Sequence, residues 1–224
     1  MGKLAKEKKV LLFDLDGTLI DPFDCITKGL QEALRVVDIT VEDREELRYL
    51  IGPPIWLSLR EHFKITEEGQ IAEVVKKYRE YFLEFGLYEN KLYPGIADML
   101  GQLKDAGHIL TMATSKPRVN AIKIAELLKF DHYFDFIGGC ELSGERSEKD
   151  EVIQYVLENV DPGREHKAIM IGDRMFDVIG AKKNGLHCIG VTWGFAPEGE
   201  LEEHGADMIV ESPEELCTAL LAIS

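Results

Sequence analysis

The chain has 224 residues, 45% of them hydrophobic, which is enough for one sizeable core or for one core with a small inserted module. Its acidic side chains outnumber its basic ones by 41 to 26, and the formal net charge of −15 excludes a nucleic acid polymer as a partner, because nucleic acid selects basic surfaces. No apolar run reaches the roughly 18 residues of a membrane-spanning helix, so we expect no membrane partner.

The first predicted element is a strand at Val10–Phe13, and a long stretch without strand patterns follows it. Between about residues 22 and 90, apolar side chains recur at helical spacing instead. The helices predicted there are Asp24–Val37, Arg44–Leu50, Ile55–Phe63 and Glu67–Phe85. We therefore expect a helical module at residues 21–92, inserted into a core of residues 1–20 and 93–224, with two adjacent junctions that act as a hinge.

The rest of the chain alternates short apolar runs with amphipathic stretches. The predicted strands are Ile109–Ala113, Phe134–Ile137, Ala168–Ile171, Cys188–Val191 and Met208–Val210. The predicted helices are Ile96–Ala106, Val119–Leu128, Glu148–Glu158, Phe176–Asn184 and Pro213–Leu221. Near-continuous apolar runs are typical of parallel strands that are buried on both faces. The alternation predicts an α/β fold with a doubly wound parallel sheet and right-handed crossovers.

Polar or acidic residues follow three of the predicted strands. Asp14 and Asp16 follow the first strand, Thr114 and Ser115 follow the second, and Asp173 follows the fourth. In an open parallel sheet, ligands bind in the crevice outside the carboxyl ends of the strands. We therefore expect these side chains to meet in one crevice.

The aspartates predict a magnesium site. Asp14 and Asp16 are two residues apart, so on an extended chain they project to the same side, and two carboxylates that close stay ionised only with a cation nearby. Asp173 adds a third oxygen donor, and such a set suits Mg²⁺. Asp177 lies one helical turn beyond Asp173, where it could hold a metal-bound water or orient Lys149. Taken singly, each aspartate could instead be a helix cap, a turn residue or a solvated carboxylate.

Hydroxyl groups at the end of the second strand suit a phosphate. Thr114 and Ser115 can offer hydroxyl and backbone N–H donors to phosphate oxygens, although Thr114 could also be an ordinary strand end. An anionic substrate needs a locally positive site in so acidic a protein, and a metal ion with a few placed cations could supply it. Spacing alone does not single out Lys149, and Lys116 and Arg146 are weaker candidates still.

Four segments together resemble the motifs of the haloacid dehalogenase-like hydrolase superfamily. In chain order they are Phe13-Asp14-Leu15-Asp16-Gly17-Thr18-Leu19, Thr114-Ser115-Lys116-Pro117, Lys149 and Gly172-Asp173-Arg174-Met175-Phe176-Asp177. The helical module resembles the cap domain of the phosphoglycolate phosphatase-like branch, in which Asn often stands at the position of Ser115. The resemblance implies a Rossmann-like core domain and a magnesium-dependent phosphatase, a phosphoric monoester hydrolase.

The resemblance also implies roles for the residues of these motifs. Asp14 would be the nucleophile that forms an aspartyl phosphate, and Asp16 would protonate the leaving oxygen and then deprotonate the attacking water. Thr114 and Lys149 would hold the phosphoryl oxygens. The implied metal ligands are Asp14, the backbone carbonyl of Asp16 and Asp173, with Asp177 in support.

The expected substrate is a small phosphorylated metabolite, and the expected activity is similar to that of a phosphoglycolate phosphatase. Gly52-Pro53-Pro54-Ile55 resembles a loop of relatives known as phosphoglycolate phosphatases or 5′-nucleotidases, so we expect Gly52, Pro53 and Pro54 to select the leaving group. A 5′-nucleotidase and a β-phosphoglucomutase-like phosphomutase are alternatives. The presence of Asp16 and Asp173 argues against a dehalogenase, and the complete set of carboxylates argues against a non-catalytic phosphate-binding module.

The cysteines and the N-terminal composition bear on the compartment. The four cysteines form no CxxC pair and have no histidine at zinc-ligand spacing, so we read them as reduced thiols. The Lys-rich start of the chain lacks the apolar stretch of a secretory signal. We expect a cytoplasmic protein that is a monomer or a weak dimer.

Overall fold

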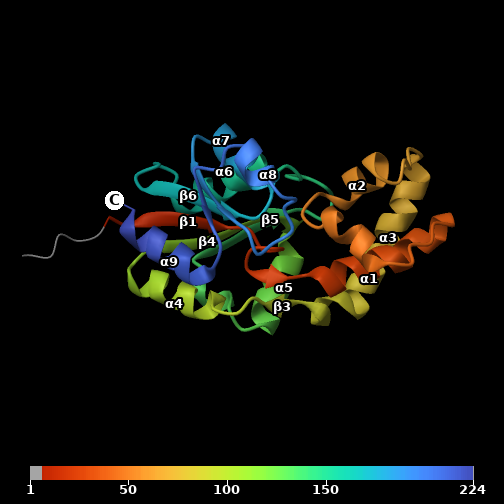
Figure 1. Cartoon of the computed structure of the whole chain (residues 1–224), viewed down its shortest axis with the longest axis horizontal. Coiled ribbons are helices and arrows are strands. Elements are labelled where there is room, and N and C mark those ends of the chain that lie inside the picture. Colours follow the sequence, from red (N-terminus) through yellow and green to blue (C-terminus); the bar gives the residue numbers. More distant parts are fainter. Residues whose placement is uncertain (1–6, 224) are drawn as a thin grey trace, which may run out of the picture.

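The centre of the molecule is a six-stranded parallel sheet, seen in a computed structural model that describes residues 7–223 (Figure 1). The strand order is β5-β4-β1-β6-β7-β8, and every neighbouring pair is parallel. The strands are β1 (Lys9–Phe13), β4 (Ile109–Pro117), β5 (Phe136–Cys140), β6 (Lys167–Gly172), β7 (His187–Val191) and β8 (Met208–Val210). The predicted α/β fold is confirmed.

Helices cover both faces of this sheet (Figure 1). On one face are α4 (Ile96–Asp105), α5 (Arg118–Leu127) and α9 (Pro213–Ala222). On the other are α6 (Lys149–Val160) and α7 (Met175–Lys183), with the short α8 (Glu200–Glu203) beside them. Leu11 and Phe13 of β1 pack on the first face, whereas Val10 and Leu12 pack on the second. Because both faces are buried, the strand reads as a continuous apolar run.

Two strands differ from their predicted bounds by more than one residue. Strand β4 continues to Pro117 rather than ending at Ala113, with a register shift between Thr114 and Pro117. Strand β5 begins at Phe136, two residues later than predicted, because Phe134 belongs to the turn after a short 3₁₀ helix, η4 (Asp131–Tyr133). The Phe134 ring packs edge-on against Phe13, with 6.3 Å between the ring centroids. Its apolar character therefore reflects burial and not strand pairing.

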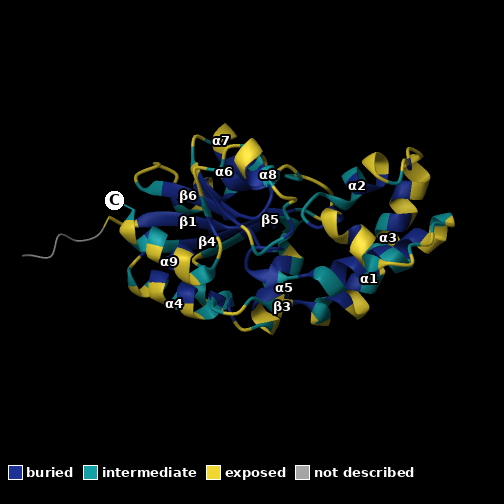
Figure 2. Cartoon of the chain, in the orientation of Figure 1, coloured by how far each residue is buried: buried dark blue, intermediate teal, exposed yellow. Residues whose placement is uncertain are grey.

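Residues 21–92, which we call the helical insert, leave the sheet after β1. They form α1 (Phe23–Leu34), η1 (Arg35–Val37), η2 (Arg44–Leu50), α2 (Ile55–Glu61), α3 (Glu68–Glu84) and η3 (Gly86–Glu89), where η marks 3₁₀ helix. Leu30, Leu47, Leu59 and Val74 form part of a hydrophobic cluster within the insert, which Phe195 of the sheet domain joins. Figure 2 shows α1 and α3 with one buried and one exposed side, as the helical periodicity predicts.

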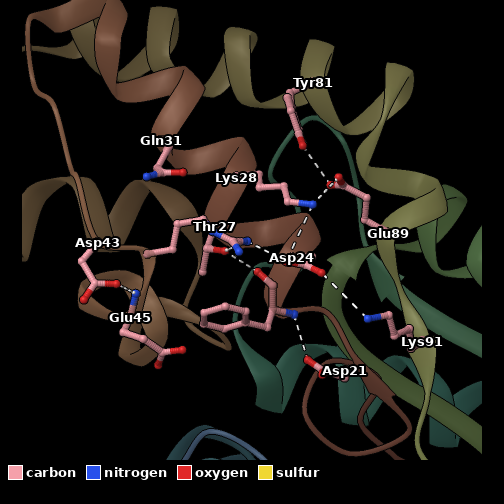
Figure 3. Close-up of polar contacts among 12 residues, drawn as sticks. Asp21, Asp24, Thr27, Lys28, Gln31, Asp43, Glu45, Tyr81, Glu89 and Lys91 are labelled. Carbon is pink, nitrogen blue, oxygen red and sulfur yellow. Dashed lines mark hydrogen bonds and ion pairs between the residues drawn. The ribbon is translucent and has the colours of Figure 1, made fainter.

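The two ends of the insert are paired. The short strands β2 (Ile20–Asp21) and β3 (Lys91–Leu92) run antiparallel, which brings the two junctions together as expected, although this pairing was not predicted. Figure 3 shows the charged contacts around them. The Lys28 ammonium lies 2.8 Å from Glu89 Oε1, and Lys91 lies 3.9 Å from Asp24 Oδ2. These two ion pairs link the second junction to α1, at a site that a hinge would use.

None of the helices in the described part of the chain is long and apolar enough to span a membrane.

Candidate functional site

Three buried carboxylates meet at the carboxyl edge of the sheet. Asp14 directly follows β1, Asp173 directly follows the neighbouring strand β6, and Asp177 lies in the first turn of α7. Each offers one oxygen, and these oxygens lie within 4.8 Å of one another. The N–H of Asp14 donates to the Ile171 carbonyl at 2.9 Å, which locks the ends of β1 and β6 together. The predicted convergence of Asp14 and Asp173 therefore follows from the parallel pairing of their strands.

Asp173 is held in one orientation by its surroundings. Its Oδ1 accepts a hydrogen bond from the Thr18 hydroxyl at 3.2 Å, and its Oδ2 accepts one from the Phe195 N–H at 2.8 Å. A Cβ atom at Gly17 would lie 2.1 Å from Asp173 Oδ2, and one at Gly194 would lie 2.3 Å from it. Glycine at these positions lets the backbone approach the carboxylate closely, and Gly17 also has a positive φ of 82°.

The electrostatics of this cluster favour a bound cation. Burial raises the pKa of Asp173 well above its ordinary value, and the charges of Asp177 and Asp14 raise it further. Burial also raises the pKa of Asp177 to about 6, although Lys149 opposes the shift. Three oxygen donors with this mutual repulsion have the chemistry of a magnesium site.

Lys149 bridges two of the three carboxylates. It begins α6 and is buried, and its Nζ lies 2.8 Å from Asp14 Oδ1 and 2.8 Å from Asp177 Oδ1. It also donates to the Ala113 carbonyl at 3.0 Å. Burial lowers the pKa of Lys149, but the attraction of Asp14 and Asp177 outweighs this effect and leaves the pKa above its ordinary value. The ammonium is therefore charged, and Asp177 orients it, which is one of the two possibilities that the sequence left open.

The sequence predicts that the third carboxylate beside Asp14 and Asp173 is that of Asp16. In the structure the third carboxylate of the cluster is that of Asp177, and the Asp16 carboxylate lies outside the cluster. The prediction assumed an extended chain through Asp16. Strand β1 ends at Phe13, however, and residues 15–20 form a tight turn in which the Leu15 carbonyl accepts three N–H groups. The Asp16 side chain consequently points to Lys116, whose Nζ lies 2.8 Å from Oδ2 and 2.9 Å from Oδ1. The implied role of the Asp16 backbone carbonyl stays a prediction.

Asp16 and Lys116 form a buried ion pair that sequence reasoning missed. Their side chains are only 13% and 7% exposed. Burial raises the pKa of Asp16 above its ordinary value, although the Lys116 charge opposes it. A carboxyl group with a raised pKa holds a proton more readily, as a general acid must. The signal available in the sequence was the position of Lys116, directly after the predicted Thr114-Ser115 segment.

Thr114 and Ser115 lie where the prediction placed them, at the end of β4 beside β1. Thr114 is buried, and its hydroxyl accepts the Lys116 N–H at 3.2 Å. Ser115 is half-buried and lines a cavity of about 180 Å³ between the edge of the sheet and the helical insert. Asp14, Asp16, Thr114, Ser115 and Lys149 thus belong to one region.

The helical insert forms much of the cavity wall. Gly52, Pro53, Pro54 and Trp56 line it, and the selecting role of the first three stays a prediction. The other residues that the insert contributes are mainly apolar or aromatic: Ile26, Leu30, Leu50, Ile55, Ser58, Val75, Tyr78, Arg79 and Phe82. The sheet domain adds Asp16 and Lys116, so the cavity opens directly beside the carboxylate that is the candidate acid.

Both neutral polar groups and cations line the cavity. Ser58 is buried, and its hydroxyl has no hydrogen-bond partner among residues 7–223. Burial also raises the pKa of the Tyr78 hydroxyl well above its ordinary value, so this group remains a neutral donor. In contrast, Lys116 is paired with Asp16, and Arg79 donates to the Leu142 carbonyl at 3.0 Å.

Comparison with known proteins agrees with this geometry. A family model described as haloacid dehalogenase-like hydrolase matches residues 11–191. A 5′-nucleotidase from Pseudomonas aeruginosa is 42% identical over 213 residues, which cover 95% of this chain and 92% of that protein.

Two solved structures show the same architecture. A predicted phosphatase from Clostridium acetobutylicum is 43% identical with a TM-score of 0.92, covering 97% of this chain and 100% of its own. A predicted phosphoglycolate phosphatase from Haemophilus somnus has a TM-score of 0.79 over 95% of this chain and 98% of its own, and its identity of 21% shows likeness of fold alone.

Proposed function

Because this chain belongs to the haloacid dehalogenase-like hydrolase family, we propose that it is a magnesium-dependent phosphatase that transfers a phosphoryl group to Asp14 and then to water. The observation that carries the proposal is the meeting of Asp14, Lys149 and Asp173 near a partly open cavity that Asp16 and Ser115 line. The family and the enzyme class predicted from the sequence are confirmed by the comparisons. The mechanism, the metal and the substrate are our proposals.

The carboxylate cluster supports Mg²⁺ as the cofactor. Asp14 and Asp173 would hold the ion together with the backbone carbonyl of Asp16, and Asp177 would support it. When bound, the ion neutralises charge on the phosphoryl oxygens and so favours attack by another anion. The buried, mutually repelling oxygens of Asp14, Asp173 and Asp177 fit that charge.

Phosphoryl transfer follows from the placement of the protein groups. An Asp14 oxygen attacks phosphorus, the bond from phosphorus to the leaving oxygen breaks, and Asp16 gives that oxygen a proton. Asp16 then takes a proton from water as the water attacks phosphorus, which breaks the bond to Asp14 and releases inorganic phosphate. Lys149 and the donors at Thr114 and Ser115 stabilise the phosphoryl oxygens throughout.

The cavity supports a nucleoside 5′-monophosphate as the substrate. Trp56, Tyr78 and Phe82 offer aromatic surface, and the Ser58 hydroxyl offers a neutral hydrogen-bonding group for a sugar or a base. The carboxylate of phosphoglycolate would need a cation, and Lys116, the lysine that lines the cavity, is already paired with Asp16. The name of the 42% identical relative, 5′-nucleotidase, agrees with this choice. We therefore favour the nucleotidase alternative over the phosphoglycolate model and over a phosphomutase.

A panel of phosphate esters tests the substrate. We expect kcat/KM for nucleoside 5′-monophosphates to exceed that for phosphoglycolate by about 10-fold or more, because a site with unpaired polar groups discriminates against a substrate that cannot pair with them. Inorganic phosphate release measures hydrolysis, and glucose 1-phosphate in the same panel detects a mutase by its isomerised product. A preference for phosphoglycolate would contradict the nucleotidase proposal, and sugar isomerisation without phosphate release would contradict hydrolysis.

Metal removal tests the cofactor. We expect EDTA to abolish activity on p-nitrophenyl phosphate and added Mg²⁺ to restore it, because Lys149 alone leaves the charge of the phosphoryl oxygens and of the attacking Asp14 carboxylate only partly neutralised. Ca²⁺ should substitute poorly, since its larger and looser coordination would misplace the nucleophile. Full activity after exhaustive chelation would overturn the magnesium proposal.

We also propose a cytoplasmic location, which the four free and buried thiols support, and a monomer or weak dimer.

A further inference from the structure

Arg174 joins the metal-site segment to the helical insert. It stands directly after Asp173 at the start of α7 and is buried. Its Nη1 donates to the carbonyl of Tyr49 at 3.2 Å and to the carbonyl of Ile51. Its Nε and Nη2 donate to the two carboxylate oxygens of Glu200 at 2.8 and 3.2 Å. The guanidinium therefore spans the boundary between the sheet domain and the insert.

The two carbonyls that Arg174 binds immediately precede the predicted selecting loop. Gly52 follows Ile51 with a φ of +110°, and a Cβ atom at Gly52 would lie 2.9 Å from Arg174 Cγ. Pro53 and Pro54 come next, and because proline has no N–H, these two residues cannot donate backbone hydrogen bonds to hold the loop in place. The position of the loop consequently depends on contacts made just before it.

We propose that Arg174 is a positioning residue that holds the Gly52–Pro54 loop against the cavity and so sets discrimination between leaving groups. The inference rests on the proposed function in one respect, because its activity assay uses a nucleoside 5′-monophosphate as the substrate. The role of Arg174 in placing the loop does not depend on which substrate the enzyme hydrolyses.

Glu200 keeps Arg174 aimed at the loop. The ion pair is bidentate, and the two side chains are only 7% and 10% exposed. Charge-assisted, paired hydrogen bonds of this kind fix orientation as well as adding energy. Glu200 Oε1 also accepts the N–H of Met175 at 2.9 Å, so the start of α7, the arginine and the loop form one connected unit.

A second contact across the same boundary does not involve Arg174. The buried Phe195 ring belongs to the hydrophobic cluster of the insert and lies 4.9 Å from the Arg48 guanidinium. We therefore expect the insert to stay docked when Arg174 is replaced, and the loop alone to loosen.

The test compares Arg174→Met and Glu200→Gln with the control Arg44→Met. Arg44 also forms a close ion pair, with 2.6 Å between its Nη1 and Asp24 Oδ1, but both residues belong to the insert.

We expect Arg174→Met to lower kcat/KM for a nucleoside 5′-monophosphate by about 10- to 100-fold, mainly through KM. This is the range expected for the loss of charged hydrogen bonds. Activity on p-nitrophenyl phosphate should fall by less than about 3-fold, since the reacting groups are untouched. Arg44→Met should alter the ratio of the two activities by less than about 2-fold.

Hydrogen–deuterium exchange in the free enzyme provides a readout that needs no substrate. We expect faster exchange at residues 49–56 in Arg174→Met and, to a smaller degree, in Glu200→Gln, with the sheet strands unchanged. The double variant should lose no more discrimination than Arg174→Met alone, because Glu200 acts through Arg174.

Two results would overturn the proposal: unchanged exchange at residues 49–56, or equal losses on both substrates. If Arg174→Met does not fold, Glu200→Gln carries the same comparison. If the wild-type enzyme hydrolyses no nucleotide, the substrate proposal fails, while the exchange measurement still decides the role of Arg174.

Discussion

Replacing Asp14 by asparagine should lower kcat for every phosphate ester by on the order of 10⁴-fold or more, the scale expected when the nucleophile of a covalent mechanism is removed. The amide has the size of the carboxylate but is not an effective nucleophile toward phosphorus. Lys149 keeps its ion pair with Asp177 at 2.8 Å, so the fold persists. Steady-state kinetics on p-nitrophenyl phosphate, together with a thermal melt, measures both effects.

Asp135→Asn is the matched control for this variant. Asp135 also bonds a strand, since its Oδ2 accepts the Leu110 N–H at 2.9 Å, but it precedes β5 and lies outside the carboxylate cluster. Its replacement should leave kcat within about 2-fold of wild type, as expected for a residue that does not touch the reacting atoms. Substantial turnover in Asp14→Asn would eliminate Asp14 as the nucleophile.

Replacing Lys149 by methionine should lower both activity and stability. We expect kcat/KM to fall by about 10²- to 10³-fold, the effect of removing one preorganised donor to a reacting oxyanion. Because Asp14 and Asp177 would lose the cation that lies 2.8 Å from each, the free energy of unfolding should fall by about 3–5 kcal/mol, as for other broken buried ion pairs. Kinetics and denaturant unfolding measure the two losses separately.

Lys104→Met provides the comparison for an exposed lysine. Lys104 lies 2.7 Å from Asp135, but both side chains are more than a third exposed, so the change should cost only about 0–1 kcal/mol. If Lys149→Met is destabilised yet retains wild-type kcat/KM at a temperature where it is folded, Lys149 has only a structural role.

The sequence predicts the position of a site residue correctly when that residue directly follows a buried strand. Asp14 and Asp173 directly follow β1 and β6, and Phe13, the last residue of β1, pairs with Ile171 one residue before the end of β6. Parallel pairing alone then brings the two carboxylates together. The same reasoning failed for Asp16, because the turn that starts at Leu15 ends the alternation of side chains on which the prediction relied.

Contacts between distant polar side chains could not be predicted in this way. Lys116 reaches Asp16 across 100 residues, and Arg174 reaches the Tyr49 carbonyl across 125. Long, flexible cations leave no periodic pattern in a sequence, and their partners depend on how the insert folds back over the sheet. The register shift between Thr114 and Pro117 in β4 likewise leaves no signal in the apolar pattern of the strand.

The most direct test of Asp14 as nucleophile is rapid-quench mass spectrometry of the Asp16→Asn variant during turnover of p-nitrophenyl phosphate. The activated leaving group needs little protonation in the first step, whereas the second step loses its general base, so the phosphoenzyme should accumulate. We expect the mass of one added phosphoryl group, mapped to the peptide that contains Asp14. Turnover with no phosphorylated protein at any quench time, or a phosphoryl group mapped to another residue, would contradict the proposed mechanism.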